Sequence, residues 1–564
     1  MSVKEVPPIN PEVKEQTAGE RKISKVRIAG LIGGILAGLL VYFLMPANAS
    51  DVIEKSINDP EALKEMNIGA VAIVAGVAVW MAIWWMTEAI SLAATAMIPL
   101  VVFPLLQVNE YKGVAGSYAS DTIFLFMGGF ILAVAMQRWS LDRRIALSVV
   151  RIVGVKPRRL ILGFMIATGF ISMWVSNTAT AVMMLPIGLS VIQLFESAQD
   201  KAANTKALDI EAAYSGSIHG GVLGGLVNKD EDAATTTAEK HGIKRSNFAI
   251  GLMLAIAYSA SIGSLATPIG TPPNTLLKAY MSDSLHYEIN FGKWFLMGLP
   301  MVIVFTLVAW WILAFVMFKP EMNELPGGKE LINEELKKLG KLRGGELLVT
   351  LLFVLAVFCW IFVPFILKAY GIEIKKFDAI VAMSVALLLF IIPGRTNGER
   401  LVTWNEAKTI PWDILLLFGG GLSLSKQFEH TGLSNWIGEQ VKSLSAAPTV
   451  LIVLAVAALV LFLTELTSNT ATAAAFLPII GGVAMGIGLQ GQNVMILTIP
   501  AALAATCAFM LPVATPPNAI AYGSGYLKIS DMIKGGFLIA LVGLVLITIT
   551  VFALAVPIFG LVLP

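Results

Sequence analysis

The chain has 564 residues, of which 56% are hydrophobic and 14% are charged, and its formal net charge is +2. Soluble domains carry about 25% charged residues, so this composition excludes an ordinary soluble protein and indicates many membrane crossings. The sequence has no HExxH motif, no paired histidines and no nucleophile–base constellation. Its two cysteines, Cys359 and Cys507, lie in apolar runs without metal-ligand neighbours. We therefore expect no enzyme, no disulfide framework, no organic cofactor and no nucleic-acid partner.

The first 28 residues are polar and basic, and we expect them to form a cytoplasmic tail. The apolar run that follows, at 29–45, ends near Ala47-Asn48-Ala49, which resembles a signal-peptidase site. The long charged leader and the many later apolar runs favour a retained first helix. Residues 50–66 are acidic, which fits a loop on the outer side.

Eleven membrane-spanning helices are predicted from the apolar runs, at about 29–45, 69–86, 88–106, 120–138, 248–280, 294–318, 346–367, 377–393, 411–429, 494–527 and 535–560. The fourth is followed by seven arginines and lysines between Arg138 and Arg159. The positive-inside rule places this block in the cytoplasm. The N-terminus is then cytoplasmic and the C-terminus external. Lys375 and Lys376 fall outside, against the rule.

A five-residue sequence occurs twice, as Ser176–Thr180 and, 292 positions later, as Ser468–Thr472. The same offset relates Asp121 to Asp413 and Pro186 to Pro478. Several matches at one offset indicate an internal duplication. In an apolar chain, a duplication of this length is typical of a transporter built from two halves.

Each copy lies in the middle of an apolar stretch, at 160–194 and 450–485. About 35 residues are too many for one span and too few for two, since a span needs about 20. The pattern predicts two re-entrant hairpins of half-length helices with a polar tip. Five predicted spans separate the two tips, and an odd number inverts orientation. The fold class expected is therefore an all-α polytopic membrane protein with inverted-topology repeats.

A second repeated motif follows each hairpin, as Ala266–Asn274 and as Ala514–Asn518. The pair of adjacent prolines within each motif predicts a broken helix. This motif recurs at an offset of 244 (Thr271 to Thr515), so the first half carries an insert, which we place at about 197–245. A cytoplasmic loop decoration is the simplest interpretation of the insert, and a regulatory role is the alternative.

Broken helix ends expose backbone groups that cannot face lipid but can line a polar cavity. Helix N-termini there suit anions, and carbonyl and hydroxyl oxygens suit Na⁺. Neither motif contains Lys or Arg, so the pattern favours a small multivalent anion transported with Na⁺. Glu465 could be a structural acceptor or take part in ion coupling. Asp121 and Asp413 are expected to be helix N-caps.

These motifs resemble those of the divalent anion:sodium symporter family, the INDY-type carboxylate and sulfate transporters. The similarity covers about residue 70 to the C-terminus, and rests on the two SNTAT tips and on GTPPN and ATPPN in the two breaks. The resemblance implies a homodimer whose transport domain moves against a scaffold like an elevator. It implies scaffold helices at 29–120 and 294–410 with a cytoplasmic loop at 319–345, transport regions at 121–293 and 411–534, and a last helix at 535–564.

The resemblance also implies the site residues. Sodium ligands would come from Ser172, Ser176, Asn177 and Gly270 in the first half, and from Thr464, Thr467, Asn469 and Ala514 in the second. The substrate would contact Ser176, Asn177, Thr178, Ser468, Asn469, Thr470, Thr515 and Pro516. The presence of Thr470 favours C4 dicarboxylates, because some citrate-preferring relatives change this position.

The function expected is Na⁺-coupled import of succinate, malate or fumarate across a plasma membrane, most simply a bacterial inner membrane. Within the same class, a sulfate or citrate symporter or a Na⁺-independent dicarboxylate exchanger stays open. From another class, an anion channel could share the broken helices. It would not need two hairpins with cation-ligating tips, and Na⁺-dependent accumulation would exclude it.

Overall fold

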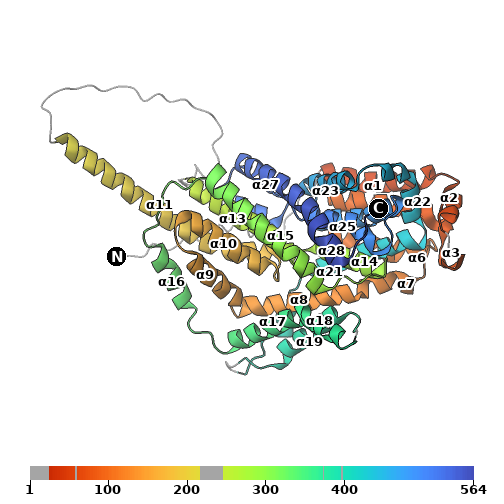
Figure 1. The fold of residues 1–564 in the computed structure, drawn as a ribbon, viewed down its shortest axis with the longest axis horizontal. Coiled ribbons are helices and arrows are strands. Elements are labelled where there is room, and N and C mark those ends of the chain that lie inside the picture. Colours follow the sequence, from red (N-terminus) through yellow and green to blue (C-terminus); the bar gives the residue numbers. More distant parts are fainter. Residues whose placement is uncertain (1–24, 58–59, 216–244, 373, 395–397, 564) are drawn as a thin grey trace.

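The computed structural model describes residues 25–57, 60–215, 245–372, 374–394 and 398–563 (Figure 1). The predicted N-terminal tail, up to residue 24, and residues 216–244 of the predicted insert lie outside this part of the chain. The described residues are mostly helical, and a single isolated bridge, between Pro393 and Arg400, is their only β-type pairing. The two cysteines are free thiols.

The first half of the chain forms the helices α1 (Lys25–Leu44), α2 (Ala49–Ser56), α3 (Pro60–Glu65), α4 (Val71–Thr87), α5 (Leu92–Thr95), α6 (Ile98–Leu105), α7 (Tyr111–Gly116), α8 (Asp121–Arg138), α9 (Leu141–Val153), α10 (Pro157–Ser172), α11 (Asn177–Ser215), α13 (Asn247–Ser264) and α14 (Pro272–Asp283).

The rest forms α15 (Phe291–Trp311), α16 (Gly328–Lys338), α17 (Gly345–Ile361), α18 (Val363–Ala369), α19 (Phe377–Ile391), α20 (Trp404–Ala407), α21 (Trp412–His430), α22 (Leu433–Gln440), α23 (Thr449–Leu466), α24 (Asn469–Gly486), α25 (Met495–Ala505), α26 (Pro516–Gly523), α27 (Ile529–Thr550) and α28 (Val556–Phe559).

Among the described residues, nine helices are long and apolar enough to cross a membrane, or ten if the bent pair α17–α18 is one span. This confirms a polytopic membrane fold. The expected spans at 88–106, 377–393, 411–429 and 494–527 are helices that are shorter or more polar than the other spans. Several of the nine are arms of the hairpins, so eleven spans plus two hairpins stays a prediction.

Prolines explain where the spans are interrupted. The expected third span is divided into α5 and α6, with Pro99 in the first turn of α6. The seventh bends by 43° between α17 and α18, where Pro364 opens the second helix. A proline lacks the N–H that the preceding turn needs and disfavours a helical residue before it. The breaks between α13 and α14 and between α25 and α26 follow the same rule at Pro272 and Pro516.

Both predicted hairpins are present as helix–turn–helix pairs, α10–α11 and α23–α24, and the turns fall at the SNT motifs. Their arms are longer than the half-length helices expected. The arms α23 and α24 have 18 residues each and could each cross a membrane by length and composition. The arm α11 has 39 residues, continues to Ser215 and projects from the body of the molecule (Figure 1). The expectation that the arm ends near 194 was wrong, because the polar sequence after it still forms helix.

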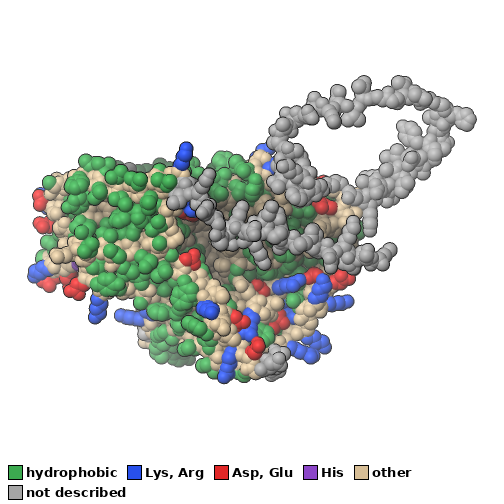
Figure 2. Space-filling model, turned by 180° about the vertical axis from the view of Figure 1, so that it is seen from behind, with side chains coloured by type: hydrophobic (Ala, Val, Ile, Leu, Met, Phe, Trp, Pro, Cys, Tyr) green, Lys and Arg blue, Asp and Glu red, His purple; other side chains and the backbone are tan. Residues whose placement is uncertain are grey.

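The outer surface has the pattern expected next to lipid. On α27, large hydrophobic side chains are exposed at every fourth position, at Ile533, Phe537, Leu541, Val545 and Ile549. This spacing places them on one face of the helix. Figure 2 shows a broad area of hydrophobic side chains on one side of the molecule, with many of the charged side chains toward its margins. A surface of this kind is stable only in contact with lipid or another protein.

The expected N-cap roles of Asp121 and Asp413 were wrong. The N-cap of α8 is Ser120, whose Oγ accepts a hydrogen bond from the Thr122 N–H at 3.4 Å. The N-cap of α21 is Pro411. Asp121 is the first and Asp413 the second residue of its helix, and in the first turn a carboxylate complements the positive end of the helix dipole.

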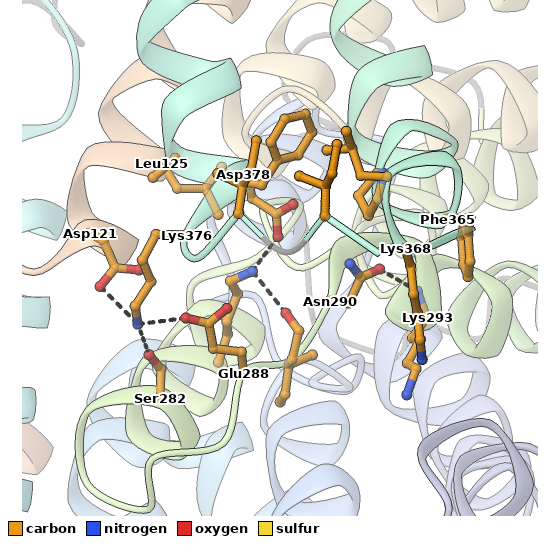
Figure 3. A pocket seen from close by; sticks show the side chains of 18 of the residues that line it. Asp121, Leu125, Ser282, Glu288, Asn290, Lys293, Phe365, Lys368, Lys376 and Asp378 are labelled. Atoms are coloured by element: carbon orange, nitrogen blue, oxygen red, sulfur yellow. Dashed lines mark hydrogen bonds and ion pairs between the residues drawn. The ribbon is translucent and has the colours of Figure 1, made fainter. Parts of the chain in front are cut away.

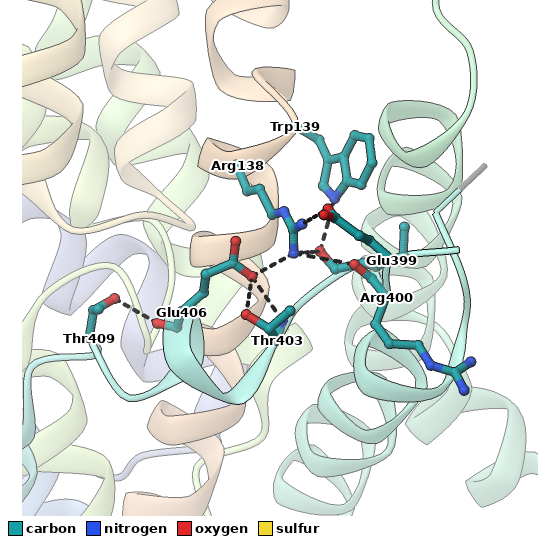
Figure 4. A network of polar contacts seen from close by, with 8 residues as sticks. Arg138, Trp139, Glu399, Arg400, Thr403, Glu406 and Thr409 are labelled. Carbon is teal, nitrogen blue, oxygen red and sulfur yellow. Dashed lines mark hydrogen bonds and ion pairs between the residues drawn. The ribbon is translucent and has the colours of Figure 1, made fainter. Parts of the chain in front are cut away.

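The C-terminal end of α8 forms hydrogen bonds and ion pairs with the segment after α19 (Figure 4). The Arg138 guanidinium lies 2.5 Å from a Glu406 carboxylate oxygen and 2.8 Å from one of Glu399. The Trp139 indole N–H donates to the Leu401 carbonyl at 2.9 Å. This network and extensive packing of α8 on α19 hold these two helices together.

Candidate functional site

The first tip contains a group of closely spaced oxygens. Ser172 Oγ, at the end of α10, lies 2.7 Å from Asn177 Oδ1 and 2.6 Å from the Ala260 carbonyl oxygen of α13. A hydroxyl carries one proton and can donate to only one of these two acceptors. The second contact therefore has two explanations: a turned Asn177 amide whose nitrogen donates to Ser172 Oγ, or a cation shared by the three oxygens.

The second tip repeats this arrangement. Thr464 Oγ1, at the corresponding place in α23, lies 2.7 Å from Asn469 Oδ1 and 2.7 Å from the Ala505 carbonyl oxygen of α25. Thr464 is fully buried. Hydroxyl, amide and carbonyl oxygens are the ligand types that hold Na⁺ in transporters with broken helices. The sequence offset of 292 therefore relates two sites of the same chemistry.

The two breaks are closed in the same way. Asn274 Nδ2 donates to the carbonyls seven and ten residues before it, at 3.0 and 3.4 Å. Asn518 Nδ2 donates to carbonyls at the same two spacings, at 3.0 and 3.2 Å. The threonines that precede the following helices also share a conformation, with φ −145° and ψ 144° at Thr271 and φ −141° and ψ 150° at Thr515. Both breaks are thus loops of unwound backbone that the same asparagine hydrogen bonds hold in a defined conformation.

The structure places the other expected substrate contacts at the starts of helices. Ser176 Oγ accepts from the Ala179 N–H at 3.3 Å, and Thr515 Oγ1 accepts from the Asn518 N–H at 3.3 Å. Ser468 is the N-cap of α24, and its side chain makes no cap hydrogen bond. The remaining three lie in the first turns of α11, α24 and α26, where Thr178 and Pro516 are exposed and Thr470 is half-buried.

Not every expected sodium ligand joins the oxygen groups. Thr467 Oγ1 instead contacts Thr472 Oγ1 at 2.6 Å and the Leu463 carbonyl at 2.9 Å, within its own hairpin. Gly270 and Ala514 are buried in the two breaks. A Cβ on Gly270 would lie 2.3 Å from the Ser264 carbonyl oxygen, so only glycine allows the first break to close.

At this site, helices of each half pack against helices of the other half. The tip helix α24 packs against α14, which follows the first break, and the tip helix α11 packs against α26, which follows the second. The breaks also meet directly, because Thr271 Oγ1 lies 3.3 Å from Thr506 Oγ1. Each tip is thereby placed beside the break of the other half, which is the arrangement required for one central site.

One difference between the halves involves a buried carboxylate. The Glu465 carboxylate accepts hydrogen bonds from three consecutive N–H groups of the second break, those of Phe509, Met510 and Leu511, at 2.7 to 3.3 Å. The first half has Met173 here, whose carbonyl accepts from Thr267 Oγ1 at 2.5 Å. Of the two roles considered for Glu465, the structural acceptor is the one these contacts support.

Several residues of the site were missed from the sequence. The carbonyls of Ala260 and Ala505 complete the two oxygen groups, but alanines in an apolar run carry no signal of a ligand. Ser264 Oγ accepts from Asn177 Nδ2 at 3.3 Å. Its position only a few residues before the first proline motif was the one available clue.

A bundle of apolar helices, interrupted by two polar turns and two paired breaks, defines a polytopic membrane transporter. The family model of the sodium:sulfate symporter transmembrane region matches residues 30–561. The chain therefore belongs to this family, which confirms the predicted membership of the divalent anion:sodium symporters. The family consists of transporters and not of enzymes.

Three similar proteins carry the name sodium-dependent dicarboxylate transporter SdcS. The one from Staphylococcus saprophyticus is 39% identical over 542 residues, which cover 96% of this chain and 94% of the relative. Those from Staphylococcus aureus strains USA300 and NCTC 8325 are 40% identical over 481 residues, which cover 85% of each chain. The similarity thus includes both tips and both breaks.

Proposed function

We propose that this chain is a secondary active transporter that imports C4 dicarboxylates, such as succinate, malate or fumarate, together with Na⁺. The observation that supports this most is the repeated group of a hydroxyl, an amide and a carbonyl oxygen at the two tips. The relatives named sodium-dependent dicarboxylate transporters support the same ion and the same substrate class.

The substrate site lies between the tips. The first turns of α11 and α24 supply backbone N–H groups. Those of α14 and α26 each begin with two prolines, which have no N–H, so these helices contribute mainly the positive ends of their dipoles. Substrate carboxylates contact Ser176, Asn177, Thr178, Ser468, Asn469, Thr470, Thr515 and Pro516. Because no lysine or arginine occurs in these motifs, the two sodium ions balance the charge of the dianion.

Sodium is held on each side of the substrate. In the first half the ligands are Ser172, Ser176, Asn177 and Gly270, joined by the Ala260 carbonyl. In the second half they are Thr464, Thr467, Asn469 and Ala514, joined by the Ala505 carbonyl. In the structure Thr467 contacts Thr472 instead, so its part in the site requires a rotation of its side chain.

The coupling ratio follows from the membrane potential. Moving one charge through 100 mV costs about 2.3 kcal/mol, so a dianion entering a negative interior is opposed by about 4.6 kcal/mol. Two sodium ions cancel this cost, and a third would allow the potential to drive uptake. We infer at least two ions per substrate and expect a third. Uptake in vesicles that does not respond to voltage would argue against the third ion.

The assembly and topology belong to the same proposal. The protein works as a homodimer in a bacterial inner membrane, with its N-terminus in the cytoplasm and its C-terminus outside. The halves are inverted repeats, and the transport regions move as an elevator against the scaffold helices. The sequence duplication and the packing of helices of one half against those of the other support the repeat, and the arginine-rich segment after α8 supports the orientation.

Sulfate is the second candidate substrate, because the matching family is described as sodium:sulfate symporters. Sulfate carries the same charge as a C4 dicarboxylate and could use the same helix N-termini. A C4 dicarboxylate has two separated carboxylates, one for the first turn of each tip helix. Sulfate is a single, shorter group and lacks this second contact point.

The test is uptake of radiolabelled succinate into proteoliposomes with an inward Na⁺ gradient, against K⁺ or choline. We expect uptake that requires Na⁺ and that Asn177→Ala and Asn469→Ala abolish. Ser190→Ala is the matched control, because its hydroxyl lies on the same helix as the first tip but bonds to that helix's own Pro186 carbonyl. Equal exchange without Na⁺ would change the function to antiport, and flux of sulfate alone would change the substrate.

A further inference from the structure

A cavity of about 500 Å³ lies away from the tips, between α14, α15, α18, α19 and the start of α8 (Figure 3). Of the residues that the structure describes, four lysines and three carboxylates line it. This end of the bundle includes the loop of Lys375 and Lys376, which is expected to face outside, where lysines are uncommon. The transport mechanism assigns no role to these lysines.

Two of the four lysines are neutralised within the protein. Lys278 Nζ lies 2.5 Å from an Asp378 carboxylate oxygen in a buried ion pair. Lys376 Nζ lies 3.2 Å from Asp121 and 3.4 Å from Glu288. All three carboxylates of the cavity are thereby engaged.

The other two, Lys293 and Lys368, have no ion pair with any residue that the structure describes. They lie near each other at the opposite end of the cavity, beside Asn290 and Phe365 (Figure 3), and their charges repel each other. Gly292 allows Phe365 of α18 to approach the start of α15, because a Cβ at this position would lie 2.9 Å from the Phe365 ring. The fold thus brings two like charges together without a counter-ion among the described residues.

The start of α15 adds to the positive field. Asn290 is its N-cap and accepts from the Lys293 N–H at 3.2 Å, so the side chain of Lys293 projects from the first turn of a 21-residue helix. A helix N-terminus carries a partial positive charge and free N–H groups. Together with two ammonium groups, it suits an anionic group with several oxygens, such as a phosphate or a carboxylate.

The rim of the cavity favours a lipid as the source of this anion. Phe365, Ile372 and Ile374 line the cavity and are exposed, and every residue of α18 is at least partly exposed. Apolar side chains beside cationic ones fit the boundary between acyl chains and headgroups. We propose that Lys293 and Lys368 form a binding site for an anionic phosphate group, supplied by the headgroup of an anionic phospholipid.

The experiment uses the purified full-length chain in neutral detergent and K⁺ buffer without Na⁺. Binding of phosphatidylglycerol is measured by its shift of the thermal midpoint and by native mass spectrometry, against phosphatidylcholine. We expect saturable binding of phosphatidylglycerol only. One lysine near an anionic surface contributes about fivefold to affinity, so Lys293→Gln/Lys368→Gln should weaken binding about 30-fold and the single variant Lys368→Gln about fivefold.

Lys375→Gln is the matched control. This exposed lysine lies in the loop between α18 and α19, close in sequence to Lys368, but does not line the cavity. It should bind phosphatidylglycerol as the wild type does. A shift with inorganic phosphate that the double variant loses, without binding of the lipid, would keep the anion site and refute its lipid source. Equal lipid binding by wild type and double variant, or no binding of either anion, would overturn the proposal. Because no transport is measured, these results are independent of the proposed function.

Discussion

Replacing Glu465 by glutamine tests how the second break is held against the second tip. The wild-type carboxylate makes four short contacts with three N–H groups, two to each of its oxygens. Glutamine keeps one oxygen, which can still accept from Phe509 and Met510. Its amide nitrogen then faces the N–H of Leu511, which is left without an acceptor.

The magnitude follows from these contacts. An unsatisfied buried N–H costs about 1 to 3 kcal/mol, and a hydrogen bond to a charged acceptor is worth about 1 kcal/mol more than a neutral one. The total loss is about 3 kcal/mol. Because the break carries the Ala514 and Thr515 end of the second site, part of this loss should oppose sodium binding. We expect the half-saturating Na⁺ concentration for uptake to rise at least about tenfold, since a factor of ten needs about 1.4 kcal/mol.

The matched variant in the first half is Thr267→Val, which removes one neutral hydrogen bond from tip to break, that to the Met173 carbonyl. It should cost about 1 kcal/mol and change sodium affinity by about fivefold or less. Both variants are compared by Na⁺-dependent succinate uptake and by thermal midpoint. If Glu465→Gln matches the wild type in both, a charged carboxylate does not hold the break.

Three further changes test the packing and charges. Lys278→Ala leaves Asp378 buried without its partner and should cost about 3 to 5 kcal/mol, whereas a double replacement by apolar residues should recover much of the thermal midpoint. Gly263→Ala places a Cβ 2.2 Å from a backbone oxygen of α10 and should abolish uptake. Burial raises the pKa of Asp142 from 3.8 to about 6, so the folded protein loses stability as the pH rises through 6. Asp142→Asn should raise the thermal midpoint at pH 7.5 and match the wild type at pH 4.

Controls for these variants are available in the same chain. Lys442→Ala removes an exposed ion pair with Glu439 at 3.2 Å and should change stability by less than about 1 kcal/mol. Gly33→Ala introduces a Cβ with no atom within 4 Å and should be neutral. A Lys278→Ala variant as stable as Lys442→Ala, a fully active Gly263→Ala variant, or a midpoint difference for Asp142→Asn that does not depend on pH would each contradict the reasoning.

The duplicated motifs allowed the two polar turns, where the proposed site lies, to be predicted from the sequence. Ser172 and Asn177 stand five residues apart, as do Thr464 and Asn469, and the structure joins each pair at 2.7 Å. The breaks were predictable because proline cannot continue a helix. What identified the polar turns was the repetition of a polar sequence where an apolar one was expected.

Other features had no signal in the sequence. The carbonyls of Ala260 and Ala505 join the two oxygen groups only because the hairpins pack against α13 and α25. The extension of α11 to Ser215 was missed because polar residues with good helix propensity continue a helix without an apolar face. Ser120 was passed over as the N-cap of α8 because an aspartate follows it directly, and both residue types cap helices well.

The most direct test of the two sodium sites is equilibrium binding of ²²Na⁺ to the purified protein, with unlabelled Na⁺ and K⁺ as competitors. We expect Na⁺ but not K⁺ to displace the label. Ser172→Ala and Thr464→Ala should each bind one ion fewer than the wild type, while Ser190→Ala should bind the full number. If both tip variants bind as many ions as the wild type, the repeated oxygen groups are not the sodium sites.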